Sequence, residues 1–402
     1  MKIYKKEFKM KILLCLLNFF VLLPLFTNNL VALGAEPTSG FTVSLDEYDF
    51  AGGKEANLYS YSTDNLILNT VFPEIRNAYN SYRKWDTNSY KCRIDLYEDL
   101  TVNDITHCND VGCEIDFYLH GHTLRLNYDS SYWYFNSGLY FNGGTVTSDT
   151  SNVGSGCLWI TGGYLSADNV KFTNFNTQKR YPLLNVNEDR SSASFTNCEF
   201  VNMSSTSYGG AIYMNHVDVL EFDHCTFSNC SSYYGGAIYL ENVVSQYALD
   251  ADTLCIDNCK AKYGGGFYIE DNYAGDTFPS FHFWHSEIKN CSAVYYGGGI
   301  YSDCYEANIN FHDSIIDSCS AQYGAALYTC ASGTGYTIDS RNCKSEYGGD
   351  IYDEYNSNAG TLLSSGSLTI LFGALTGVFL ITSIVFAFLY FKDKKGKNNS
   401  SL

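Results

Sequence analysis

The chain has 402 residues and a formal net charge of −18, with 35 tyrosines and 26 phenylalanines. A strongly acidic protein is repelled by phosphate backbones and anionic headgroups, so we expect neither nucleic acid nor an anionic lipid surface as a partner. With only five prolines, the chain also lacks a stiff proline-rich stalk.

Residues 1–35 are typical of a secretory signal peptide. Five lysines precede or begin an apolar run from Ile12 to Phe26, and small residues follow between Ala32 and Ala35. A basic start, an apolar centre and a small-residue cleavage site are the three parts of such a signal. We therefore expect cleavage here and export of the rest of the chain.

Residues 36–90 are predicted to form an N-terminal capping region. Between 71 and 83 the apolar residues have helical spacing, which predicts one short amphipathic helix. Strand-like alternation starts directly after this region and continues to residue 355. A stack of strands needs such a cover, because its first strand otherwise presents unpaired backbone groups to other chains.

The region 91–355 is organised around one phrase that recurs six times between residues 208 and 352. Each copy runs from one tyrosine through a glycine, two mostly small residues and an apolar residue to a second tyrosine. The steps between first tyrosines are 26, 29, 33, 27 and 24 residues, and the copies begin at Tyr208, Tyr234, Tyr263, Tyr296, Tyr323 and Tyr347. A period of this length predicts a solenoid or repeat array.

A second phrase precedes each glycine pair and consists of an apolar residue, a spacer, an Asn and usually a Cys. The clearest copies end in Asn229-Cys230, Asn258-Cys259 and Asn290-Cys291. Each repeat then holds two short β-type runs with no helical spacing between them. The predicted fold is all-β: a right-handed parallel β-helix of the pectate-lyase-like kind, in which equivalent residues stack into ladders, and much of the Tyr and Phe content belongs to these ladders.

The glycines of the first phrase are predicted to be structural. Glycine adopts backbone angles that other residues avoid, and it lets one coil approach the next closely at a tight corner. The positions are Gly209, Gly210, Gly235, Gly236, Gly264, Gly265, Gly297, Gly298, Gly324, Gly348 and Gly349. In the second phrase, we expect an inward ladder of asparagines that hydrogen-bond from coil to coil, and cysteines that act as small buried apolar residues.

Over residues 195–352, these two phrases resemble the repeat of the polymorphic outer membrane proteins. That family comprises β-helical surface adhesins of intracellular bacteria, with similar repeats in surface proteins of parasitic protists. The resemblance implies a cell-surface adhesin. Two features depart from it: the gap between Phe227 and Asn229 is one residue shorter than in the family, and this chain does not end in the outer-membrane β-barrel of the bacterial members.

The C-terminal part is predicted to anchor the chain. A polar linker covers 356–367, and 368–391 is a run of 24 residues without a charge, long enough for a transmembrane helix. Four lysines follow within the tail, 392–402. With a cleaved signal, the positive-inside rule places the N-terminus outside the cell and this tail in the cytoplasm. The expected location is the plasma membrane, as a single-pass type I protein of the cell surface.

Three N-glycosylation sequons begin at Asn202, Asn229 and Asn290, all within the predicted ladder. No catalytic, cofactor-binding or metal-binding residues stand out, since hydrolases need paired carboxylates on one face and lyases a base beside bound calcium. We therefore expect a protein that is not an enzyme and needs no cofactor.

The predicted function is adhesion or surface display, with a protein or glycan of a host or partner cell as the ligand. The insertion between Glu270 and Ser280 is the natural place for a binding surface, because insertions in repeat proteins gather on one side. Two alternatives remain open: a polysaccharide-degrading β-helix enzyme, and a non-adhesive, antigenically variable coat protein.

Overall fold

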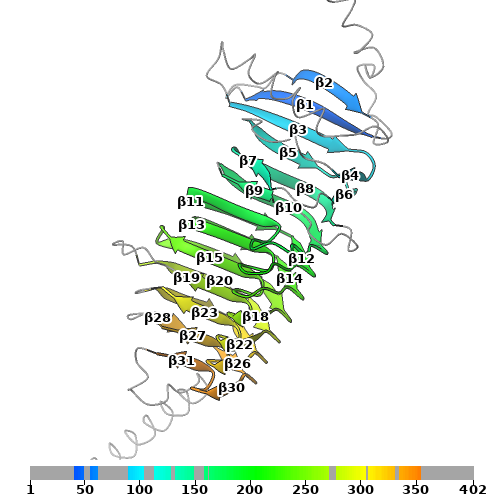
Figure 1. Cartoon of the computed structure of the whole chain (residues 1–402). Helices are drawn as coiled ribbons and strands as arrows, with labels where there is room; N and C mark the ends of the chain where they lie inside the picture. Colours follow the sequence, from blue (N-terminus) through cyan, green and yellow to red (C-terminus); the bar gives the residue numbers. More distant parts are fainter. Residues whose placement is uncertain are drawn as a thin grey trace, which may run out of the picture.

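The structure is a computed structural model, and it describes residues 40–48, 55–61, 89–103, 113–127, 132–148, 158–161, 163–270, 278–304, 307–330 and 335–354. Within these ranges the regular elements are strands, numbered β1 to β31, and there is no helix. The strands form an elongated stack from β1 and β2 at one end to β30 and β31 at the other (Figure 1). The all-β parallel β-helix repeat fold is therefore confirmed.

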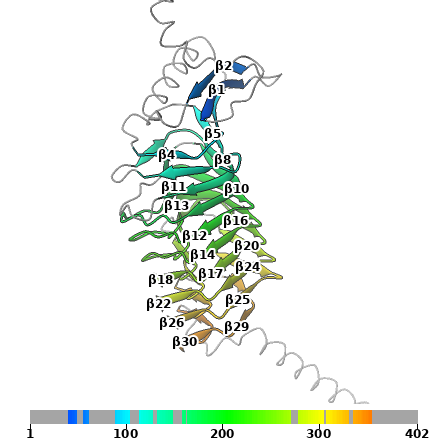
Figure 2. The same cartoon turned by 90° about the vertical axis from the view of Figure 1, so that its right-hand side faces the viewer.

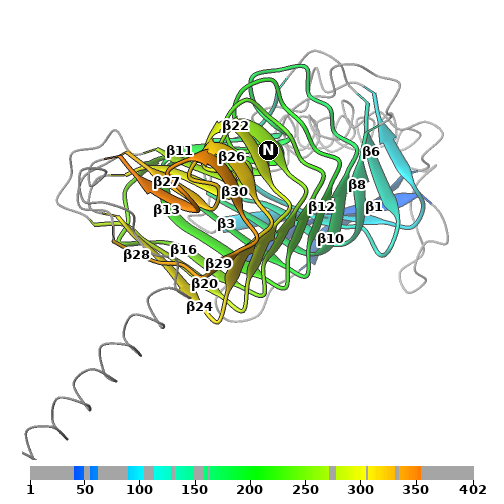
Figure 3. The same ribbon diagram turned by 90° about the horizontal axis from the view of Figure 1, so that it is seen from below.

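Each regular coil has four sides, which we call faces A, B, C and D in chain order. The view in Figure 3 shows successive coils overlaid along the stack. The sequence predicted only two β-type runs in each repeat, and this was wrong. The glycine phrase straddles a corner, so its first tyrosine ends face D and its apolar-Tyr pair begins face A, whereas the asparagine phrase ends face C.

Faces A and B carry strands paired in parallel along the stack. Face A consists of β7 (Trp133–Phe135), β9 (Leu158–Ile160), the first parts of β11 (Leu184–Thr196) and β13 (Ile212–Asp223), β15 (Ile238–Val243), β19 (Phe267–Glu270), β23 (Ile300–Asp303), β27 (Leu327–Thr329) and β31 (Ile351–Asp353). Face B consists of β3 (Ser89–Leu96), β5 (Glu114–Tyr118), the first parts of β8 (Leu139–Thr147) and β10 (Tyr164–Thr173), the last parts of β11 and β13, β16 (Tyr247–Asp252), β20 (Ser280–Trp284), β24 (Asn308–His312) and β28 (Gly335–Thr337).

Faces C and D complete the coil with shorter strands, visible in Figure 2. Face C consists of β4 (Leu100–Val102), β6 (Thr123–Leu126), the last parts of β8 and β10, β12 (Glu199–Val201), β14 (Thr226–Ser228), β17 (Cys255–Asp257), β21 (Glu287–Lys289), β25 (Ile315–Asp317) and β29 (Ser340–Arg341). Face D is a separate sheet of β18 (Lys260–Tyr263), β22 (Ser292–Tyr296), β26 (Ser320–Tyr323) and β30 (Lys344–Tyr347).

On face B, the N-terminal end of the stack consists of antiparallel strands. β1 (Phe41–Tyr48) pairs with β3 over its whole length, and β2 (Glu55–Tyr61) pairs with β1, both antiparallel. Because β1 uses the backbone groups that β3 would otherwise expose, this pairing blunts the first edge of the stack. The predicted helix over 71–83 lies outside the described residues and stays a prediction.

The segments 1–35, 356–367, 368–391 and 392–402 also lie outside the described residues. The part of the chain that the structure describes contains no helix long and apolar enough to cross a membrane.

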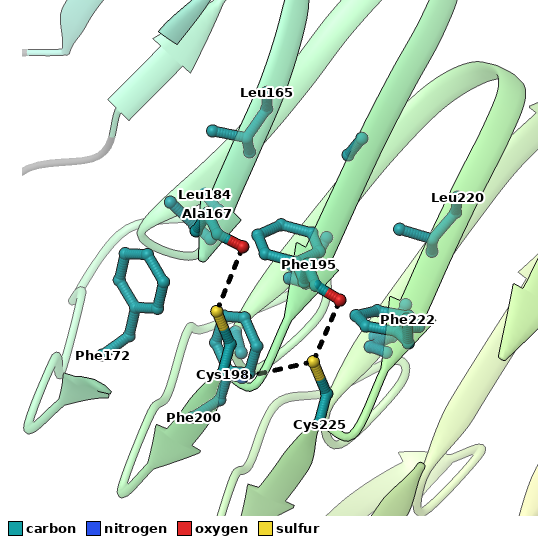
Figure 4. Close-up of a cluster of buried hydrophobic side chains, with 14 of the residues drawn as sticks. Leu165, Ala167, Phe172, Leu184, Phe195, Cys198, Phe200, Leu220, Phe222 and Cys225 are labelled. Atoms are coloured by element: carbon teal, nitrogen blue, oxygen red, sulfur yellow. Dashed lines mark hydrogen bonds between the residues drawn. The ribbon is translucent and has the colours of Figure 1, made fainter. Parts of the chain in front are cut away.

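The core is a set of inward ladders. Ile238 is fully buried, and it lies in register with Ile212 before it and Phe267 after it. Figure 4 shows phenylalanines and cysteines stacked between the walls. There, the thiol of Cys225 donates to the carbonyl of Phe195 at 3.2 Å, and Cys198 donates to the carbonyl of Ala167 at 3.4 Å. Cysteines therefore serve as small core residues with a weak donor.

The asparagine-phrase cysteines behave in the same way. Cys230, Cys259, Cys291 and Cys319 are buried, Cys343 is partly buried, and all five thiols are unbridged. Burial raises the pKa of the Cys259 thiol well above its ordinary value, which keeps it protonated. The prediction that these cysteines act as buried apolar residues is confirmed.

The phrase glycines meet two different demands. Gly209, the first of its pair, has φ of +59° and its missing Cβ would lie 2.1 Å from the carbonyl oxygen of Ile212. Gly210, the second, has an ordinary φ, but a Cβ there would lie 2.0 Å from the carbonyl oxygen of Gly236 on the next coil. The first glycine therefore makes the corner possible, and the second lets the coils pack at strand spacing.

Two tyrosine ladders line the corner between faces D and A. The rings of the second tyrosine of each phrase stack from coil to coil. For Tyr268 and Tyr301, the ring centroids are 4.5 Å apart and the planes differ by 8°. The hydroxyls of Tyr213 and Tyr239 donate to Glu241 and Glu270 on the following coil, each at 2.5 Å. Burial, and then the neighbouring carboxylate, raises the pKa of both phenols, so they stay protonated donors. This explains much of the tyrosine content.

Candidate functional site

Variation in coil length is concentrated at one corner, between faces A and B. From the second tyrosine of a phrase to the equivalent register position of face B, the chain takes 7 residues (213 to 220), 10 (239 to 249), 13 (268 to 281), 8 (301 to 309) and 8 (328 to 336). The rest of the coil varies less: 19 residues (220 to 239), 19 (249 to 268), 20 (281 to 301), 19 (309 to 328) and, in the last described coil, 16 (336 to 352). Such an edge is where a repeat scaffold places a recognition surface.

The longest connection at this corner is the predicted binding insertion. Its residues 271–277 lie outside the described residues, but both ends are placed. Glu270 ends β19 on face A, and the half-exposed Phe278 leads into β20 on face B. The insertion therefore leads directly into the strand that carries the exposed Trp284.

Face B is hollowed into a groove of about 620 Å³ that crosses four successive strands, β11, β13, β16 and β20. This volume lies within the ~300–1,000 Å³ usual for ligand sites. Its lining is mostly polar and acidic, and consists of Ser194, Thr196, Glu221, Phe222, Asp223, Asp250, Asp252, Trp284 and His285. No lysine or arginine is among these residues.

Four carboxylates in the groove form a block on two neighbouring strands. Glu221 lies in register with Asp250, and Asp223 lies in register with Asp252. All four alternate with the buried residues Phe222 and Ala251, so their side chains point outward from the sheet. Like charges directly opposite each other destabilise a sheet, so the fold bears a cost for this arrangement.

Two of these carboxylates are paired with histidines at the corner between faces B and C. Asp223 lies 2.5 Å from Nδ1 of His224, and Asp252 lies 3.0 Å from Nδ1 of His285. The hydrogen bond with His285 lowers the pKa of Asp252, and the same bond raises the pKa of His285. Both histidines have positive φ, and each takes the same corner position on its coil.

Glu221 and Asp250 have no such counter-ion: among the described residues, no ion pair involves either of them. The register neighbour of Asp250 on the next coil is His282, whose ring lies 3.2 Å from that of His312. Burial, and then His312, lowers the pKa of His282 below its ordinary value. A neutral His282 at pH 7 leaves the charge of Asp250 uncompensated.

Trp284 forms the wall of the groove on the side of the later coils. One face of its indole stacks on His312, at 3.8 Å between centroids and 13° between planes. His312 is its register neighbour on the following coil, so the opposite face of the indole turns toward the preceding coil and Asp252. The groove thus presents a fixed aromatic surface beside acidic side chains.

The three predicted glycosylation sites lie in one line at the corner between faces C and D, away from this groove. Asn202, Asn229 and Asn290 have φ of 57°, 56° and 53° and are exposed. The coil-to-coil ladder is present: Asn202 donates to Asn174 at 3.1 Å, and Asn258 donates to Asn229 at 2.7 Å. The expectation that this ladder points inward was wrong, because the left-handed corner turns these amides out to solvent. Glycosylation itself stays a prediction.

The groove carboxylates and Trp284 were not identified in the sequence. The available signal was the alternation Glu221-x-Asp223 and Asp250-x-Asp252, which becomes meaningful only once the two segments are known to be neighbours. No metal centre accompanies them: the ranges that the structure describes contain no group of three or more His, Cys, Asp or Glu able to hold a metal ion.

The fold and groove define the class of the chain as a parallel β-helix repeat protein with an acidic, tryptophan-walled groove on one face. Comparison with protein-family models, with curated proteins and with solved structures found no match.

Proposed function

We propose that this chain is a cell-surface recognition protein, an adhesin or display protein that binds host or partner cells through face B and its adjoining edge. The observation that carries this proposal is the contrast between a three-sided part of each coil that varies little in length and one edge that varies more, beside a groove. Constant packing with local variation is what a scaffold presenting a binding surface requires. The resemblance of the two phrases to the polymorphic outer membrane protein repeat supports the same reading.

The proposal includes the way the protein is held at the surface. The signal at 1–35 would export it, the apolar run 368–391 would anchor it as a single-pass helix, and the lysines of 392–402 would keep the tail inside. We also infer a right-handed coil, because crossovers between parallel strands of one sheet are nearly always right-handed. The helix expected within 71–83 would extend the cover that β1 and β2 provide.

The topology can be tested on intact cells. Protease added outside should remove an epitope placed after residue 36 and leave an epitope after residue 402 protected, because only the first would lie outside the membrane. Replacing the four lysines of the tail with glutamate should lower the fraction of correctly oriented chains. A C-terminal epitope that antibodies reach on unpermeabilised cells would contradict the assignment.

The recognition surface can be tested with the full chain displayed on a non-adhesive cell line. Replacing 271–277 by a Gly/Ser segment of equal length should reduce the binding of partner cells by about tenfold, since a few residues carry most of the energy of an interface. The matched control is the same replacement at 331–334, a shorter connection at the same edge. If cells bind the 271–277 variant as well as the 331–334 control, at equal surface levels, the insertion is not the binding site. That result would favour the non-adhesive coat protein.

Polysaccharide degradation is the second candidate, and the groove is the observation that favours it. Glu221 and Asp250 lie one strand spacing apart, about 5 Å, close to the separation of the two carboxyl groups in retaining glycosidases. New reducing ends released from a polysaccharide panel, and lost in both Glu221→Gln and Asp250→Asn, would establish it. Intact polysaccharides after long incubation would leave recognition as the function.

A further inference from the structure

The groove on face B has the features of a site for sugar rings. The indole of Trp284 is held in place by His312, which stacks on one of its faces, and its other face turns toward Asp252 on the preceding coil. An aromatic face carries partial negative charge, so it attracts the C–H bonds of a sugar ring, and it attracts an ammonium group still more strongly. Ser194 and Thr196 add hydroxyls along the opposite side of the groove. The wall therefore suits a sugar that also carries positive charge.

The charges of the groove select among sugars. Glu221 and Asp250 face each other in register and have no ion-pair partner among the residues that the structure describes, whereas Asp223 and Asp252 are paired with His224 and His285. A cation bound between Glu221 and Asp250 would remove their mutual repulsion, which a neutral sugar hydroxyl cannot do. Uronic, sialic and sulfated sugars would be repelled.

We propose that this groove binds a glycan whose sugar units carry free amines. One sugar ring stacks on Trp284, and an ammonium group of the chain lies between Glu221 and Asp250. The inference rests on the proposed recognition function of face B and names the chemical class of its ligand. It also explains why a groove on an acidic rod lacks compensating lysines: the ligand supplies the positive charge.

The test compares two probes of the same backbone with the full chain purified in a nonionic detergent. One probe is a β-1,4-linked glucosamine hexamer, and the other is its fully N-acetylated counterpart, which has no amine. Calorimetry should show that the glucosamine hexamer binds about tenfold more tightly or better, because a charge-assisted contact is worth more than a neutral one. Equal affinities, or no binding of the glucosamine hexamer, would overturn the proposal.

Variants separate a built site from general attraction to an acidic surface. Trp284→Ala and Asp250→Asn should each weaken binding of the glucosamine hexamer by about tenfold. The matched controls lie on face D: Tyr295→Ala, which removes an aromatic ring of the same 38% exposure as Trp284, and Glu346→Gln. Both controls should bind as the unchanged protein does. If Trp284→Ala has no effect, or the controls lose as much, the attraction is non-specific and the site is refuted.

Failure of the proposed ligand and failure of the proposed adhesion give different results. Partner-cell binding that depends on Trp284 while the glucosamine hexamer does not bind would reject the amine-bearing ligand and keep the recognition function. Tight, Trp284-dependent binding of the hexamer without any binding of cells would keep the ligand and reject adhesion.

Discussion

Ile238→Asp should nearly abolish the proposed surface display of the protein. Ile238 is fully buried between Ile212 and Phe267, so a carboxylate there would face apolar side chains on both neighbouring coils. A buried, unpaired charge costs several kcal/mol, which is a large part of the stability of a folded domain. Quantitative surface labelling of cells that express equal amounts of transcript measures the effect.

The matched control occupies the same ladder at the last described coil. Ile351 is the equivalent of Ile238, but it is only half-buried because no described coil follows it. Next to it, Asp350 already takes a small-residue position and accepts a hydrogen bond from Ser340 at 3.1 Å. Ile351→Asp should therefore retain most of the surface signal. Normal display of Ile238→Asp would show that this ladder contributes little to folding.

Gly236→Ala should destabilise the rod by about 3 kcal/mol, the upper end of the usual cost of overpacking. Its φ is ordinary, so the effect is purely steric: the new Cβ would lie 2.0 Å from the carbonyl oxygen of Gly265 and 2.7 Å from the amide nitrogen of Lys260. Both atoms are backbone of the next coil, and they can move only if the two coils separate. Denaturant unfolding of the full chain in detergent, followed by circular dichroism, measures the loss.

Gly335→Ala is the control for this substitution. Gly335 also has an ordinary φ, but its nearest obstacle is the side-chain oxygen of Asn308 at 2.7 Å, which can rotate away. We expect a change within about 0.5 kcal/mol, since surface substitutions without such clashes are nearly neutral. Equal unfolding midpoints for Gly236→Ala and Gly335→Ala would show that the coils are packed less closely than the structure indicates.

The sequence was sufficient for the fold because corners are specified locally. In most coils from residue 208 onward, the first glycine needs a positive φ, the second allows a close approach, and the asparagine needs a left-handed conformation. Both phrases therefore recur in the sequence at equivalent positions of these coils. The coils before residue 208 lack the full glycine phrase. Asn185 stands where Tyr213 stands one coil later, and the ring of Tyr181 fills the space beside Tyr213, at 4.9 Å, without any glycine pair.

The groove could not be found in the same way, because its residues lie across the corner of variable length. Glu221 is 8 residues after Tyr213 (221 − 213), whereas its neighbour Asp250 is 11 after Tyr239 (250 − 239). His282, the next position along the sheet, comes 14 residues after Tyr268 (282 − 268). Counting residues from the glycine phrase therefore does not align the face B strands of successive coils. Only the strand register shows that these side chains are neighbours.

The stacking of parallel strands also determines how the molecule responds to a mechanical load. Strands run across the rod, so the backbone hydrogen bonds between coils, such as the amide of Ile238 to the carbonyl of Gly266 at 3.2 Å, point along its length. A pull between the two ends loads these bonds in line and opens the coils one after another, rather than shearing a whole sheet at once. Each opened coil of 24 to 33 residues releases about 80–120 Å of chain. The protein would lengthen in steps under tension and still keep its remaining coils folded.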